Sequence, residues 1–199
     1  GQVTAPRIAS YYQSTVEDVE ARAAGVPAEE RVKVYHAING PLLTDGSDSI
    51  GADWITRTGA IDVSATEDSN GGAGDYTATL EQVYAWNPDV IVCSSAADRV
   101  SILADIQWQG IDAVSRGDVL QLPVSTSRWG QRGDPETFLA MIWLGSTLYP
   151  EQYADVDVKQ TVIDYYQDII GLTIDDATYE QILSGEGLRV QGTGNQGEK

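Results

Sequence analysis

The sequence has one cysteine and one histidine among its 199 residues, and each scarcity excludes a kind of chemistry. A single cysteine cannot form an internal disulfide. Cys93 lies in the apolar run 90–93, where a buried and inert thiol is expected. A transition-metal site usually needs several His or Cys ligands, which this chain cannot supply. No resident metal and no cofactor is therefore expected.

His36 is the only histidine, so a serine hydrolase would have to use it as its base. It falls in the middle of a predicted strand, and no Gly-x-Ser-x-Gly motif accompanies it. The pattern favours a structural histidine over a catalytic one. His36 has the chemistry of a single axial haem ligand, but no other feature of the sequence requires that role.

Positive charge is scarce as well, because 12 Lys and Arg stand against 30 Asp and Glu, a formal net charge of −18. Such a surface repels phosphate backbones and anionic lipid headgroups, so nucleic acid is not expected as a partner. Long apolar runs that could span a bilayer are also lacking. With 42% hydrophobic and 21% charged residues, the composition is that of one globular domain.

The remaining pattern alternates helices with strands. The segment 79–82 reads as a capping box, and residues 32, 34, 36 and 38 alternate along one side of a strand. We expect an α/β fold with a mostly parallel central sheet flanked by helices. Helices are predicted at about 5–24, 49–57, 79–86, 97–108, 134–149, 157–170 and 174–184, strands at 33–38, 61–63, 90–94 and 119–122, and loops at 39–46 and 65–76.

Four segments, taken in order, resemble the C-terminal lobe of the periplasmic binding proteins for cobalamin, haem and ferric siderophores. The most specific is Thr-Leu-Glu-Gln-Val-Tyr-Ala-Trp-Asn-Pro-Asp-Val-Ile-Val, residues 79–92, in which a capped helix leads into a buried strand. The others are the strand and loop 34–46, the Ala-Val-Ser-Arg-Gly-Asp-Val passage within 111–123, and the Pro-Glu helix that ends in Leu-Tyr-Pro-Glu, 135–151.

This resemblance implies a Rossmann-like lobe and a role as the ligand-binding component of an ABC importer for an iron complex, haem or corrinoid. It implies no enzymatic activity and an extracytoplasmic location, periplasmic or lipid-anchored at the cell surface. Residues 1–26 would form the connector helix to an N-terminal lobe that this chain lacks. Residues 27–185 would form the C-terminal lobe, and 186–199 a flexible polar tail.

In open α/β sheets ligands bind at the carboxyl ends of the strands, which selects the loops 39–46, 67–76 and 125–133. By resemblance these loops line the cleft. Leu43, Tyr76 and Trp129 would supply apolar or aromatic walls, while Arg128 and Arg132 would pair with carboxylate or phenolate oxygens of a metal chelate. The alternative is that all five are ordinary loop residues.

Glu81 occupies the motif position that, in this family, contacts an arginine of the permease. The alternative is a carboxylate that stabilises the first turn of its own helix by roughly 0.3–1 kcal/mol. Two other classes of protein stay open: an α/β enzyme of nitrogenase-like or chelatase-like architecture, and a stand-alone interaction module. Several polar groups converging with a bound cofactor would favour the enzyme, and a gene that encodes this lobe alone would favour the module.

Overall fold

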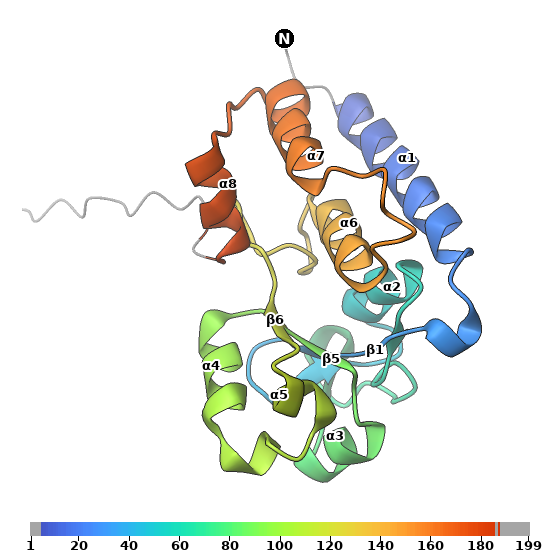
Figure 1. Ribbon diagram of the computed structural model, residues 1–199, viewed down its shortest axis with the longest axis vertical. Coiled ribbons are helices and arrows are strands. Elements are labelled where there is room, and N and C mark those ends of the chain that lie inside the picture. Colours follow the sequence, from blue (N-terminus) through green and yellow to red (C-terminus); the bar gives the residue numbers. More distant parts are fainter. Residues whose placement is uncertain (1–4, 186, 188–199) are drawn as a thin grey trace, which may run out of the picture.

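A four-stranded parallel sheet forms the centre of the protein, whose computed structural model describes residues 5–185 and 187 (Figure 1). The strand order is β3-β1-β5-β6, with every neighbouring pair parallel. A separate two-stranded antiparallel sheet joins β2 to β4. The strands are β1 (Lys33–Ala37), β2 (Leu43–Asp45), β3 (Ile61–Asp62), β4 (Asp75–Thr77), β5 (Val90–Cys93) and β6 (Val119–Gln121).

Helices cover both faces of the parallel sheet, which confirms the predicted α/β fold (Figure 1). None of the helices in the described part of the chain combines the length and apolar character needed to cross a bilayer. The predicted tail, apart from Gly187, lies outside the described residues. The helices are α1 (Ala5–Ala23), α2 (Ile50–Arg57), α3 (Leu80–Trp86), α4 (Ala96–Ala104), α5 (Asp112–Arg116), α6 (Thr137–Leu148), α7 (Val158–Asp164) and α8 (Asp176–Leu183), and a π-helical turn, Tyr165–Ile170, continues α7.

Alternation along β1 divides the core into two halves. Val34 points into the larger cluster, which α1, α2, α6 and α7 share, while Tyr35 and Ala37 point into the cluster made with α3, α4 and α5. His36 is on the same side as Val34, as the sequence pattern predicts. The edge of its ring faces Trp54 of α2, with ring centroids 5.8 Å apart. The pleat of one strand therefore sends the histidine towards the α2 side of the sheet.

Several local predictions are confirmed at their expected positions. Thr79 and Gln82 form both hydrogen bonds of the capping box at the start of α3. Asn87 ends that helix in the left-handed conformation, with φ of 42°. Cys93 is fully buried, and burial raises the pKa of its thiol to about 12, so it is an inert core residue.

Three predicted boundaries are wrong for local reasons. The expected loop 39–46 contains β2 and the expected loop 65–76 overlaps β4, because both strands are only three residues long and show no periodicity in sequence. The helix expected at 97–108 ends at Ala104, where Asp105 caps a separate turn by accepting a hydrogen bond from the Gln107 amide, 2.9 Å.

The helix predicted from residue 134 begins three residues later, at Thr137. The Asp134 carboxylate instead accepts hydrogen bonds from the amide N–H of Gly130 at 2.9 Å and of Glu136 at 3.1 Å, and from the Ser127 hydroxyl at 2.7 Å. It therefore closes the loop between β6 and α6 rather than starting the helix.

The packing of α6 yields a first prediction. A Cβ added at Gly145 would overlap the hydroxyl end of the buried Tyr153 ring. Gly145→Ala should lower the free energy of unfolding by about 1–3 kcal/mol, although alanine favours a helix by about 1 kcal/mol. Combining it with Tyr153→Leu, which removes the overlapping atoms, should cost at least ~1 kcal/mol less than the two changes do separately in denaturant unfolding. Strict additivity would show that the two residues do not compete for this space.

Candidate functional site

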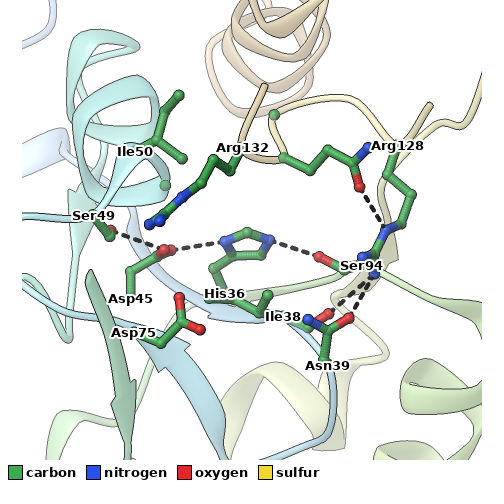
Figure 2. A pocket seen from close by; sticks show the side chains of 13 residues that line it. His36, Ile38, Asn39, Asp45, Ser49, Ile50, Asp75, Ser94, Arg128 and Arg132 are labelled. Atoms are coloured by element: carbon green, nitrogen blue, oxygen red, sulfur yellow. Dashed lines mark hydrogen bonds and ion pairs between the residues drawn. The ribbon is translucent and has the colours of Figure 1, made fainter. Parts of the chain in front are cut away.

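A pocket of about 270 Å³ lies at the carboxyl ends of β1 and β5, beside the start of α2 (Figure 2). This is the place where open parallel sheets bind ligands. Its wall is formed by the ends of β1 and β5, the segment from β2 into α2, Asp75 of β4, and the loop between β6 and α6. The lining residues used below are His36, Asn39, Asp45, Ser49, Ile50, Gly51, Asp75, Ser94, Arg128, Gln131 and Arg132.

Asp45, His36 and Ser94 form a continuous hydrogen-bonded row across the pocket (Figure 2). His36 Nδ1 lies 2.7 Å from Asp45 Oδ2, and His36 Nε2 lies 3.0 Å from Ser94 Oγ. All three side chains are at most 5% exposed. The Ser49 hydroxyl, which also caps α2, donates to the other oxygen of Asp45 at 2.9 Å.

Sequence reasoning missed this row. It read His36 as a structural strand residue and named neither Asp45 nor Ser94. A signal existed for Ser94, because His36 pairs with Val92 across β1 and β5, and Ser94 follows Val92 by two residues on the same face. No comparable signal existed for Asp45, whose short strand β2 was expected to be loop.

The pKa of the His36 imidazole is shifted upwards. Burial lowers the pKa of its imidazole, but the attraction and hydrogen bond of Asp45 outweigh burial, and the pKa is raised above its ordinary value of 6.5. The order Ser94, His36, Asp45 is that of a serine hydrolase triad. A protonated imidazole cannot take a proton from Ser94, so the row could act as a general base only above the raised pKa of His36.

Arg128 and Arg132 reach the pocket from the loop between β6 and α6, opposite the row (Figure 2). Arg128 donates to the Ile38 carbonyl at 3.3 Å and to Asn39 Oδ1 at 3.0 Å. Arg132 is exposed. Within the described residues neither arginine has a carboxylate within ion-pair distance, whereas Arg22, Arg57 and Arg116 all do. The pocket thus holds two guanidinium groups that form no ion pair with the described side chains, and Asp45 and Asp75 are the carboxylates that line the same pocket.

Trp129 does not face the pocket, contrary to the prediction that it would form an aromatic wall. Its side chain is fully buried in the core, and its Nε1 donates to Ser125 Oγ at 3.1 Å. Ser125 in turn donates to the buried carboxylate of Glu136, which also accepts from the Tyr166 hydroxyl at 2.7 Å. The indole is an anchor for the loop, which leaves the neighbouring Arg128 on the pocket side.

Leu43 and Tyr76 also do not line the pocket. Tyr76 packs against Trp86, with ring centroids 6.4 Å apart, and its hydroxyl accepts a hydrogen bond from Gln82 at 2.6 Å. Successive residues of a strand point to opposite faces, so Asp75 lines the pocket and Tyr76 does not. Leu43 is half-buried in β2, two residues before Asp45.

Glu81 is exposed in the first turn of α3, within the capping box. Its predicted contact with a permease arginine stays a prediction. As for metals, no group of three or more His, Cys, Asp or Glu side chains in the described chain is arranged to hold an ion.

Asp62 is a second buried carboxyl group near this row, after Asp45. Its Oδ1 accepts hydrogen bonds from the Ser64 amide at 3.0 Å and hydroxyl at 2.8 Å, while Oδ2 has no partner among the described residues. Burial, reinforced by the negative charge of Asp45, raises its pKa from 3.8 to about 7. The group is therefore partly protonated at neutral pH.

This predicts a pH-dependent difference in stability. A folded-state pKa above the unfolded one stabilises the fold below about pH 4, and this contribution is lost as the pH rises through about 7. Asp62→Asn mimics the protonated acid at every pH, so it should lack this loss. Between pH 4 and pH 8 the unfolding free energy of the wild type should fall relative to that of the variant by on the order of 2–4 kcal/mol. Denaturant unfolding at several pH values measures this. A constant difference at all pH values would show that Asp62 ionises normally.

Known proteins resemble this chain in sequence and in fold. No protein-family model matches the chain. The molybdate-binding protein MolA of Haemophilus influenzae is 34% identical over 148 residues, which cover 73% of this chain and 41% of the relative. The structure of MolA bound to molybdate superposes with a TM-score of 0.73 and 29% identity, covering 85% of this chain and 51% of that one.

Two further structures show the same fold at lower identity. An ABC transporter solute-binding protein of Sulfurospirillum deleyianum gives a TM-score of 0.80 at 23% identity, covering 89% of this chain and 55% of that one. Helicobacter pylori CeuE, solved with a Ni-His complex, gives a TM-score of 0.73 at 21% identity, covering 90% of this chain and 56% of that one. The chain spans about half the length of these proteins. MolA and the Sulfurospirillum protein are binding proteins of ABC transporters, and this chain has the fold of one lobe of such proteins.

Proposed function

We propose that this chain is the C-terminal lobe of an extracytoplasmic solute-binding protein that delivers an anion to an ABC importer. The observation that carries the proposal is the pair of unneutralised guanidinium groups, Arg128 and Arg132, at the carboxyl ends of the parallel strands. In a chain with a net charge of −18, two arginines without carboxylate partners suit a ligand that supplies the negative charge.

Other donors point the same way. Ile50 and Gly51 line the pocket in the first turn of α2, where backbone N–H groups have no acceptor within the helix and the helix dipole favours an anion. Together with the imidazolium of His36, the pocket offers positive charge or N–H donors on three sides. The carboxylate of Asp45 is already engaged by His36 and Ser49.

The ligand class favoured is a compact oxyanion, of which molybdate is the example bound by MolA. A pocket of about 270 Å³ is near the lower end of the range for small-molecule sites. The second candidate is an anionic metal chelate such as a ferric siderophore, whose carboxylate or phenolate oxygens would pair with the same arginines. The exposure of Arg132 at the rim favours that larger ligand.

A second lobe would complete the cleft. In this proposal residues 1–26, with α1 at their centre, connect the lobes, and residues 27–185 are the C-terminal lobe. The importer's permease would receive the loaded protein, with Glu81 as this lobe's docking carboxylate. The location is outside the cytoplasm, in the periplasm or at a lipid-anchored surface.

The ligand proposal is tested by titrating the complete gene product with molybdate, haem, cobalamin and a panel of ferric siderophores in a calorimeter. One anionic ligand should bind with a micromolar or lower Kd. Arg128→Gln and Arg132→Gln should each weaken it by about 10- to 100-fold, since each removes charge-assisted hydrogen bonds. Arg57→Gln is the matched control, because that arginine is ion-paired on α2 outside the pocket. A ligand that binds the wild type, Arg128→Gln and Arg132→Gln with the same Kd would show that it does not bind at this site.

Docking through Glu81 is tested separately in cells that carry the cognate importer. Glu81→Lys should reduce uptake several-fold and leave the solute Kd unchanged, since the residue is exposed and lies outside the pocket. Glu180→Lys reverses an exposed charge on α8 and serves as the control. Equal uptake by both variants would assign Glu81 to helix stabilisation alone.

A further inference from the structure

The hydroxyl of Ser94 has one hydrogen, and the charge state of His36 determines whether that hydrogen is donated to the imidazole. A neutral His36 that donates from Nδ1 to Asp45 has a lone pair at Nε2, so Ser94 must donate its hydrogen to the ring over the 3.0 Å contact. A protonated His36 donates from both nitrogens, so Ser94 accepts from the ring and its own hydrogen is released. Ser94 lines the pocket, so the released hydrogen is available there.

We propose that His36 is a protonation switch for the pocket, in which the Ser94 hydroxyl donates to a bound anion while His36 is protonated and turns away from it when His36 is neutral. The inference rests on the proposed function, because it concerns how the same pocket holds an anion. It adds a residue, Ser94, and a regulation by pH that a pair of arginines alone would not produce.

The charged groups around His36 come from every element that packs on it. Asp45 of β2 and Asp62 of β3 stabilise the imidazolium, while Arg128, from the loop after β6, opposes it. Asp75 of β4 and Arg132 line the same pocket. From α2 the neighbour is the uncharged Trp54, and from β5 it is Ser94.

A bound anion is linked to this balance. It lies in the pocket that His36 lines, so it adds negative charge near the imidazolium and must raise the pKa of His36 further. By thermodynamic linkage, protonation of His36 then tightens binding of the anion, and affinity falls as the pH rises through the pKa of the free protein. The ion pair with Asp45 sets that pH above the ordinary histidine value.

The first measurement needs no ligand. His36 is the only histidine among these 199 residues, so one imidazole signal in a proton–carbon NMR spectrum of this chain reports its charge state. The signal should titrate with a pKa above 6.5, and Asp45→Asn should move that pKa down. Adding molybdate should move it up. An imidazole that keeps one charge state between about pH 5 and 9 would refute the switch.

The second measurement is the molybdate Kd of the complete gene product across the same pH range, repeated with sulfate, which stays a dianion throughout. Wild-type affinity should fall with rising pH. At low pH Ser94→Ala should bind about 10- to 100-fold more weakly, the loss expected for one hydrogen bond to a charged group. Ser94→Thr retains a hydroxyl and should keep the pH dependence. Ser47→Ala, an exposed serine outside the pocket, should behave as the wild type.

The outcomes separate the two proposals. Binding that depends on Arg128 and Arg132 but is the same in wild type and Ser94→Ala at every pH would overturn the switch and leave the proposed function standing. Thermal unfolding of each variant shows whether a weak binder is folded. If Ser94→Ala is not folded, the pH dependence of binding by Ser94→Thr is the measurement that tests the switch. Absence of anion binding by the folded wild type at every pH would overturn both.

Discussion

The buried ion pair of His36 and Asp45 is the contact on which the arrangement of the pocket depends. It joins β1 to β2, and Ser49 extends it to the start of α2 by donating to the same carboxylate. Gly51 lies so close to Asp45 that any side chain there would overlap the carboxylate. Removing one partner of such a pair leaves the other charge buried and unpaired, a loss of about 3–5 kcal/mol. The carboxylate of Asp45 therefore links β1, β2 and the start of α2.

The opposite wall is held by buried acids as well. Glu136 accepts hydrogen bonds from Ser125 and Tyr166, and Asp134 accepts three within the loop between β6 and α6. Burial raises the pKa of both carboxyl groups, and the hydrogen bonds from their neighbours oppose that rise. These acids are engaged by hydroxyl and amide donors, not by cations. The loop is therefore fixed without neutralising the arginines it carries.

The sequence was sufficient for the features that depend on neighbours along the chain. The alternation through His36 and the capping box of Thr79 and Gln82 follow from spacing, and both are observed. The resemblance added the order of the elements and led to Arg128 and Arg132, which do line the pocket. Their roles in binding stay predictions.

The features that the sequence did not reveal depend on contacts between distant segments. Asp45 and Ser94 lie 9 and 58 positions from His36, so their meeting depends on the register of β5 and on the unpredicted strand β2. Trp129 was misplaced because an aromatic residue beside an arginine reads equally well as a ligand wall or a core anchor. In the structure Trp129 is a core anchor, because its indole donates to Ser125, which is itself hydrogen-bonded to the buried Glu136.

A net charge of −18 and a site for an anion are compatible, because the two act over different distances. At physiological ionic strength charges separated by more than about 8 Å are largely screened, so distant surface carboxylates contribute little within the pocket. There the nearby groups dominate: two guanidinium groups without an ion-pair partner among the described residues, and His36, whose raised pKa favours the imidazolium and whose partner Asp45 is 2.7 Å away. Asp75 is the opposing carboxylate at the rim, directly across the β2–β4 pair from Asp45. A small anion that reaches the donors is thus bound by local charge, while the acidic surface repels the much larger polyanions that could compete for the same arginines.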